Sequence, residues 1–569
     1  MTRPSPALVT PQAVRRLPRW VPWLLIAAYV LPGFVGRDPW RGTELSAFAV
    51  MLDMRDGGSW LQPQVLGETV APLQWLPYWL GAAAMTLLPL PPVWAAQLPF
   101  MALLLLTLAC TWYTTYRLAR QPAALPLAPA FGKAVRPADY ARALADGALL
   151  ALVATLGLAM LGHELGAAAV RLAAVALLGW AGTHAWSLAP HDGAHATPWR
   201  GVAAASVALP MLALAGLPWL ALLLGGAMLA WWWRAGVARP AWAAALLATL
   251  LGPALAWGLA TLAGGGWSSL EWPRGFEVTR AEEWRSLGRL LAWFVWPAAL
   301  LALWALWHWR RHWAQPHVGW PLTQAAIVLA ASLADGGGND RLLLLALPAL
   351  ATLAAWALPT LRGSLAAAVD WFALLFYTAA AAIVWIIWVA MMTGVPPKPA
   401  ANVARLVPGF EPAFEPLPVA VALLASAAWV GVVVWRVGRH TPPALWKGLV
   451  LSASGLTLNW LLLMTLWLPL LNWGMGLRPI SARIAAHVPA NTCVAVAGLG
   501  YGELGALRHH AGLTLRRLSS PTAQACPLLL TGPRVQPADV PHGWRLRADF
   551  VRLRGERERW RLWERTTAD

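Results

Sequence analysis

Two carboxylates and one guanidinium lie close together in the sequence shortly after the first apolar run: Asp38, Arg41 and Glu44. A carboxylate can take a proton from an attacking hydroxyl as a general base when it lies within hydrogen-bond reach. A guanidinium can bind two phosphate oxygens at once. The stretch therefore offers the groups for a transfer reaction on a phosphate-bearing substrate. A structural role is also open, since Thr43 and Glu44 are residue types favoured at the start of a helix.

Further polar residues stand where later apolar runs begin or end, and we expect them to contact a substrate. Glu68 and Tyr78 follow in the same loop, His163-Glu164 stands at the end of one run, and Arg341 begins another. For the arginines, contact with lipid headgroups is the alternative. His163 and Glu164 alone do not make a metal site, so we assign no metal ligand, although a divalent metal remains possible.

The composition decides which elements can position these groups. Of the 569 residues, 59% are hydrophobic and only 12% are charged, about half the ~25% that is usual in soluble proteins. This excludes an ordinary soluble protein and a disordered one. The net charge of +18 would suggest nucleic-acid binding in a soluble domain, but most arginines stand in short loops between apolar runs, where they set topology. We predict a polytopic α-helical membrane protein without a nucleic-acid partner.

The apolar runs predict the number and direction of the membrane spans. A bilayer core needs about 20 apolar residues per helix, and about thirteen stretches qualify. With the N-terminus in the cytoplasm, the inner segments hold 18 basic residues and the short outer loops hold 10, which favours this orientation. An odd number of spans then places the C-terminal tail outside. The predicted spans are 18–35, 93–117, 143–161, 165–188, 200–215, 217–233, 240–263, 288–308, 319–334, 341–358, 371–393, 417–435 and 448–472.

The composition changes near residue 472 and divides the chain into 1–472, which includes an outer loop over 36–92 with interfacial helices, and a tail over 473–569. Alternating runs in the tail predict a small extracytoplasmic α/β domain. Cys493 and Cys526 both lie in it, and an oxidising compartment permits a disulfide between them; two buried thiols on adjacent strands are the alternative.

One tail motif, Gly500-Tyr501-Gly502-Glu503-Leu504-Gly505, matches a dinucleotide-binding fingerprint. No acidic residue follows at the expected distance. We expect its glycines to make a turn and to permit close helix packing.

The order of motifs in the first outer loop resembles the bacterial GT-C glycosyltransferases that use polyprenyl-phosphate sugars, a superfamily of lipid A aminoarabinose transferases and protein O-mannosyltransferases. Thirteen spans and an outer C-terminal domain fit this family, and His163-Glu164 and the Arg341 segment match it more loosely. The matching motifs are Asp38-Pro39-Trp40, Glu44, Gly58-Ser59-Trp60, Leu66-Gly67-Glu68 and Tyr78-Trp79-Leu80-Gly81.

The resemblance implies a GT-C-like fold and a bacterial inner-membrane enzyme. Such an enzyme moves a sugar from a polyprenyl-phosphate donor to a lipid, glycan or protein acceptor on the outer face. The implied catalytic acids are Glu44 and Asp38, and the implied substrate-binding residues are Arg41, Glu68, Tyr78, His163, Glu164 and Arg341.

Two departures from the family pattern leave other readings open. The family's catalytic Asp precedes the Glu, where this chain has Thr43, and the family's Lys is absent from 71–75. A diverged member of the fold without activity is therefore one alternative. A lipid or sugar transporter is another, although it would need charges buried inside spans, and Arg171 is the only clear mid-span charge in the sequence.

Overall fold

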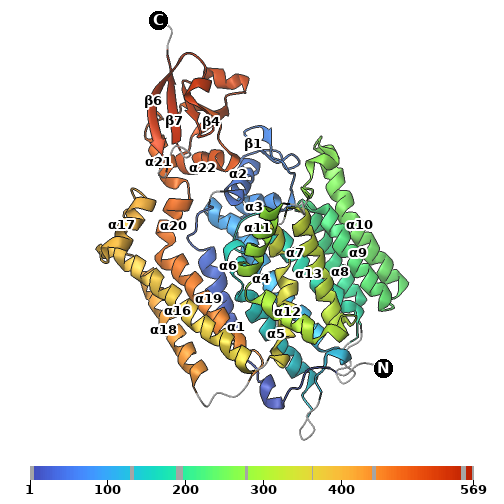
Figure 1. Cartoon of the computed structure of the whole chain (residues 1–569). Coiled ribbons are helices and arrows are strands. Elements are labelled where there is room, and N and C mark those ends of the chain that lie inside the picture. The colour runs from blue at the N-terminus through green and yellow to red at the C-terminus, as the bar shows by residue number, and fades with distance from the viewer. Residues whose placement is uncertain are drawn as a thin grey trace.

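The structure is a computed structural model of the whole chain, in which a bundle of helices carries a small sheet domain at one end (Figure 1). The N-terminus lies near the other end of the bundle. The described residues are 5–18, 20–40, 42–127, 134–187, 196–275, 280–336, 338–361, 363–438, 444–552 and 559–566.

The helices account for most of the described chain, and proline or glycine marks many of their ends. Their bounds are α1 Trp20–Val30, α2 Thr43–Arg55, α3 Leu76–Leu87, α4 Pro92–Ala119, α5 Pro137–Val153, α6 Leu156–Leu161, α7 Ala167–Gly182, α8 Pro198–Leu214, α9 Pro218–Arg234, α10 Arg239–Leu262, α11 Ala281–Trp293, α12 Ala298–His308, α13 Pro316–Ala334, α14 Asp340–Leu344, α15 Leu347–Ala355, α16 Gly363–Thr393, α17 Pro397–Leu406, α18 Pro416–Val437, α19 Lys447–Leu466, α20 Leu468–Met475, α21 Arg478–Ala485 and α22 Tyr501–Ala511.

The structure confirms a polytopic helical membrane fold, but it does not confirm thirteen spans. Within the described residues seven helices are long and apolar enough to cross a membrane, or eight if α11 and α12, which meet at 90°, count as one. Several predicted spans are shorter or broken because proline and glycine interrupt them. The predicted spans 200–215 and 217–233 correspond to α8 and α9, two helices of 17 residues each, which a turn at Gly216 with φ +96° separates. The run over 341–358 divides into α14 and α15, where Pro348 starts a new helix.

Within the first outer loop, residues 43–55 form α2. α2 is buried along most of its length, including Phe48 and Met51. Two short antiparallel strands, β1 (Gln64–Val65) and β2 (Glu68–Thr69), follow it. α2 is covered because the C-terminal domain rests directly on it.

The C-terminal domain contains a five-stranded sheet in the order β4-β3-β5-β7-β6. β3 lies between β4 and β5 in parallel pairing, and β7 joins β5 and β6 in antiparallel pairing. The mixture of parallel and antiparallel strands with flanking helices confirms the expected α/β class. The strands are β3 Cys493–Ala497, β4 Thr514–Arg517, β5 Leu528–Thr531, β6 Trp544–Val551 and β7 Arg559–Arg565.

The glycines of the fingerprint-like motif allow α22 to lie against α2. A Cβ atom at Gly502 would come 3.1 Å from Leu45 Cβ, and one at Gly505 would overlap Ala49. Close approach of the two helix backbones thus explains both glycines. The expectation of helix packing is confirmed at these positions.

Charge pairs tie the same domain to the first outer loop, with the acids on the loop and the arginines on the tail. Arg508 lies 3.0 Å from both Asp53 and Asp56. Asp38, predicted to be catalytic, pairs with Arg478 at 2.8 Å. Glu68, predicted to bind substrate, pairs with Arg517 and accepts a hydrogen bond from the Tyr501 hydroxyl. These contacts give Asp38 and Glu68 interdomain partners.

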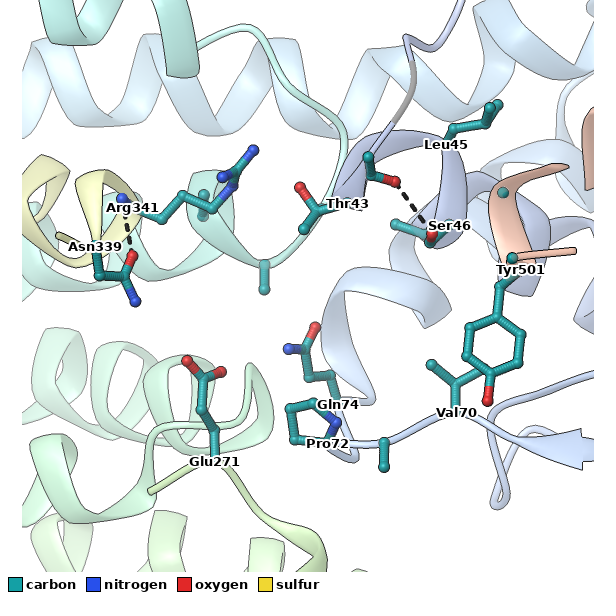
Figure 2. Close-up of a pocket in the computed structure, with 18 of the residues that line it drawn as sticks. Thr43, Leu45, Ser46, Val70, Pro72, Gln74, Glu271, Asn339, Arg341 and Tyr501 are labelled. Atoms are coloured by element: carbon teal, nitrogen blue, oxygen red, sulfur yellow. Dashed lines mark hydrogen bonds between the residues drawn. The ribbon is translucent and has the colours of Figure 1, made fainter. Parts of the chain in front are cut away.

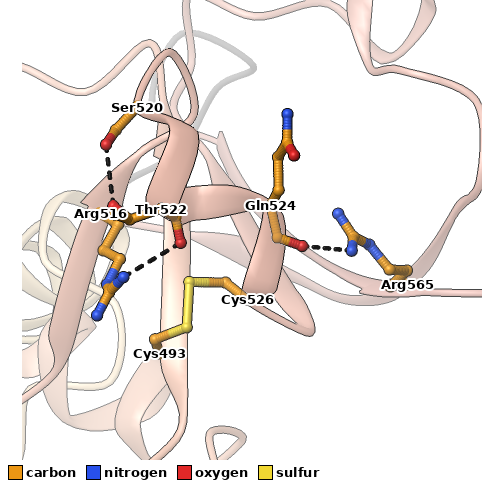
Figure 3. The surroundings of a disulfide bond; sticks show 7 residues. All are labelled: Cys493, Arg516, Ser520, Thr522, Gln524, Cys526 and Arg565. Atoms are coloured by element: carbon orange, nitrogen blue, oxygen red, sulfur yellow. Dashed lines mark hydrogen bonds between the residues drawn. A yellow bond between two sulfur atoms is a disulfide. The ribbon is translucent and has the colours of Figure 1, made fainter.

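A disulfide joins Cys493 at the start of β3 to Cys526, 33 residues later (Figure 3). Closing a loop of this length stabilises a domain by about 3–4 kcal/mol in the chain-entropy model. We expect Cys493→Ser/Cys526→Ser to lower the unfolding free energy of the C-terminal domain by about this amount.

Urea-dependent proteolysis of the domain within the full chain measures this loss. Cys110→Ser is the control, because Cys110 is a free buried thiol in α4. Equal resistance of the double variant and the wild type would refute the prediction.

Candidate active site

A cavity of about 1450 Å³ lies where the membrane helices meet the C-terminal domain. Its wall includes the first turns of α2, α7 and α22. Figure 2 shows Arg341 and Thr43 along the upper edge of the space, with Gln74 and Glu271 across from them at the lower edge. Polar or charged lining residues include Thr43, Ser46, Gln74, Tyr78, Glu164, Arg171, Glu271, Arg274, Asp335, Asn339, Asp340, Arg341, Tyr501, Glu503, Arg534 and Arg552.

One part of the wall is an ion pair between two residues that the sequence predicted. Arg341 Nη2 donates to Glu164 Oε1 at 3.0 Å and to Oε2 at 2.9 Å, and Asp340 lies 3.5 Å from its other terminal nitrogen. Asn339 caps α14 by accepting hydrogen bonds from the backbone of Arg341 and Leu342. The cap holds Arg341 in the first turn of α14. The Arg341 side chain stays 33% exposed, so its guanidinium can reach a bound anion.

Glu164 lies in the loop between α6 and α7, outside the spanning segments. Burial raises the pKa of its carboxyl from 4.5 to about 7, more than the positive charge of Arg341 lowers it, and the nearby Glu44 carboxylate raises it further. A carboxyl with a pKa near the operating pH is suited to taking up and releasing a proton.

A second ion pair lies in another part of the wall. Arg171, 5% exposed, donates to Glu271 at 2.5 Å and to the Ala215 carbonyl at 2.9 Å. The sequence placed Arg171 within a span. It lies near one end of this candidate span, in the second turn of α7, because the helix begins at Ala167 beside the cavity. Tyr78 and Gln74 line the same cavity, so hydroxyl, amide, carboxylate and guanidinium groups all reach it.

Glu44 has a different environment from the one expected for a base. Its carboxylate is 2% exposed and forms a two-pronged pair with the buried Arg37. The backbone N–H groups of Trp40 and Leu165 each donate to it at 3.1 Å. Both oxygens are thus occupied, and Glu44 is not among the residues that line the cavity, whereas Thr43 is. The geometry favours a structural role for Glu44 through its ion pair with Arg37, and not through capping, since no side chain among the described residues caps α2.

We therefore expect Glu44→Gln to act on stability rather than on chemistry alone. The change leaves the buried Arg37 charge without a counter-charge, which costs about 3–5 kcal/mol. Urea unfolding of the detergent-purified protein measures the loss. Arg37→Met/Glu44→Gln removes both charges and should recover part of it. A Glu44→Gln protein that unfolds like the wild type but has no turnover would make Glu44 the base.

The other predicted residues are distributed as follows. His163 is 1% exposed, stacks on Trp460 with ring centroids 4.7 Å apart and fills the space beside Gly33. It packs in the core rather than against the cavity. Tyr78 lines the cavity. Arg41 lies outside the described residues. Within the described residues no group of three or more His, Cys, Asp or Glu side chains is arranged to hold a metal ion.

Sequence reasoning missed several cavity residues. Glu271 and Gln74 stood in outer loops without a motif around them. Tyr501, Arg534 and Arg552 come from the C-terminal domain, and no local pattern linked that domain to the first outer loop. The charge match between loop acids and tail arginines was the one signal in the sequence that pointed to their contact.

Comparison with solved structures finds the same fold at low sequence identity. ArnT from Cupriavidus metallidurans bound to undecaprenyl phosphate matches with a TM-score of 0.60 and 14% identity, covering 95% of this chain and 98% of that one. Its apo state matches with a TM-score of 0.61 and 15% identity, covering 95% and 97%. No family model and no curated protein matches the sequence. The chain therefore has the ArnT-like GT-C fold, along nearly its whole length.

Proposed function

We propose that the chain is an integral membrane glycosyltransferase. It moves a sugar from a polyprenyl-phosphate donor to a lipid, glycan or protein acceptor at the outer face of a bacterial inner membrane. The observation that carries this proposal is the cavity where Arg341, Glu164 and the first turn of α2 meet, within a fold shared with an ArnT that was solved with undecaprenyl phosphate.

The side chains of the cavity suggest a division of roles. Arg341 would bind the donor phosphate, because a guanidinium stabilises the charge that develops on a departing phosphate. Glu164 would take the proton of the acceptor hydroxyl. The hydroxyl oxygen then bonds to the anomeric carbon of the sugar. The bond between that carbon and the phosphate oxygen breaks, and its electron pair goes to the phosphate. Arg171, Glu271 and Tyr78 would hold sugar hydroxyls.

A second candidate is a diverged member of the fold that binds its lipid but does not transfer sugar. Thr43 lines the cavity at the position of the catalytic Asp in the family that the loop resembles. The transporter alternative would need charges buried inside spans, and Arg171 lies near one end of α7 on the cavity wall. A Thr43→Asp protein that gains turnover over the wild type would favour the diverged reading.

The test uses the full chain in lipid nanodiscs with a panel of polyprenyl-phosphate sugars and lipid, glycan and peptide acceptors. Acceptor-dependent release of polyprenyl phosphate, followed by mass spectrometry, is the expected result. Binding of undecaprenyl phosphate without release under any combination would favour the non-catalytic reading. Absence of both binding and release would overturn the proposal.

The proposed site requires a defined orientation in the membrane. We expect the N-terminus in the cytoplasm and the C-terminal domain in the periplasm, because basic residues favour the inner side. Alkaline phosphatase fused after Asp569 should be active, and the same reporter fused within the 310–316 connection should be inactive. The reverse pattern would place the cavity on the cytoplasmic side and refute the orientation.

A further inference from the structure

A buried histidine lies at the end of the bundle away from the cavity. α7 starts at the cavity and runs 16 residues, or about 24 Å, before a short 3-10 helix, η4 (Thr183–Ala185). His184 in this segment is 1% exposed. Its Nδ1 lies 2.6 Å from Thr197 Oγ1, while its Nε2 has no hydrogen-bond partner among the described residues. An unpaired buried polar group is costly, so this nitrogen lacks a polar partner within the part of the chain that the structure describes.

Two guanidinium groups lie beside this histidine. Arg117, near the end of α4, donates from Nε and Nη2 to Thr183 at 3.0 and 3.4 Å, which fixes its orientation. Arg200 lies exposed in the first turn of α8. The two are close enough to repel each other, and both charges act on His184. Within the described ranges, no ion pair joins Arg117 or Arg200 to a carboxylate. We call Arg117, His184 and Arg200 the inner arginine cluster.

The position of the inner arginine cluster suits a ligand at the membrane surface. Trp199, next to Arg200, is 60% exposed, as expected for a tryptophan in the interfacial region. His184 also contacts Trp180 edge-on, with 4.5 Å between the ring centroids. This contact is weaker than a hydrogen bond and does not replace one at Nε2. Basic pockets between spanning helices bind the phosphates of anionic lipids.

We propose that the inner arginine cluster binds a phosphate group, supplied by the headgroup of an anionic lipid in the adjacent leaflet. The phosphate joins two like charges that otherwise repel each other, and its oxygens can accept a hydrogen bond from His184 Nε2. This site is separate from the cavity and does not depend on the proposed reaction.

The experiment compares the full chain in nanodiscs of phosphatidylcholine alone with nanodiscs that also contain cardiolipin or phosphatidylglycerol. Native mass spectrometry counts retained lipid. We expect the wild type to retain anionic lipid, and Arg117→Gln/Arg200→Gln to lose about 30-fold in affinity, since each arginine near the surface contributes about 1 kcal/mol, roughly a factor of five. The exposed Arg200→Gln alone, which should not affect folding, is expected to lose about fivefold.

The matched control is Arg310→Gln/Arg311→Gln, which removes the same charge at another connection between helices. The proposal fails if this control loses as much lipid as the cluster variant, or if the cluster variant loses none. A second arm adds inorganic phosphate to phosphatidylcholine nanodiscs. Saturable, cluster-dependent binding in that arm alone would assign the phosphate to a soluble source, and lack of cluster-dependent binding in both arms would overturn the site.

Discussion

Replacing Arg341 with alanine should lower kcat/KM for sugar transfer by about 10²- to 10³-fold, the usual loss when one group that stabilises a developing negative charge is removed. Arg341 is the cavity guanidinium that is paired with Glu164 yet remains 33% exposed. Because its charge also lowers the pKa of Glu164, its loss should raise that pKa. The remaining activity should then require a more alkaline pH. Initial rates between pH 5.5 and 9 with a polyprenyl-phosphate sugar measure both effects.

Two further variants separate binding of phosphate from loss of structure. Arg341→Lys keeps the charge without the two-pronged geometry and should recover part of the rate. Arg405→Ala, on the exposed helix α17, should leave the rate unchanged. If the Arg341→Ala enzyme has the wild-type rate and pH profile, Arg341 has no role in the mechanism.

The second large effect is expected at Glu164. Glu164→Gln should slow transfer by about 10²- to 10⁴-fold, the range for loss of a general base. In the wild type, the carboxyl with a pKa of about 7 must be ionised to act. The rate should therefore fall about tenfold for each pH unit below 7 and level off above it. In Glu164→Gln this slope should disappear.

The stability of the same variant distinguishes a base from a structural carboxylate. The folded-state pKa of Glu164 is raised above its unfolded value of 4.5. Its stabilising contribution is therefore present below pH 4.5 and is lost as the pH rises through about 7. Above that pH, Glu164→Gln should unfold no earlier than the wild type. Marked destabilisation at pH 8, with an unchanged rate per folded molecule, would contradict a catalytic role.

The sequence predicted the class of fold because the class depends on the apolar length and the hydrophobic pattern of each segment taken alone. Apolar length predicted a helical membrane protein, and alternating runs predicted the C-terminal domain. The count of thirteen spans is not confirmed by helix length, because a helix that other helices surround does not need a full 20 apolar residues. α15 has 9 residues in a run that was predicted as one span, and its packing against neighbours is not encoded in local hydropathy.

The candidate site was harder to predict because the direction of each side chain decides which residues line the cavity. Thr43 and Glu44 are adjacent, yet Thr43 faces the cavity and Glu44 faces Arg37. The family resemblance pointed to Glu44, whereas helix geometry turns the neighbouring Thr43 toward the cavity. Arg341 and Glu164 lie 177 residues apart, and their pairing follows from packing of α7 against α14, which no local pattern shows.

The salt bridges between loop acids and tail arginines also bear on how the protein is made. Asp38 and Asp53 leave the ribosome long before their partners, which follow 440 and 455 residues later. Domains form in order of synthesis, so the nascent chain carries these acids unpaired until the last segment has been made. The cavity wall closes only at that point. Chains shortened by a late stop codon would be left with an open, incomplete cavity, and folding of the final hundred residues becomes the step at which the protein matures.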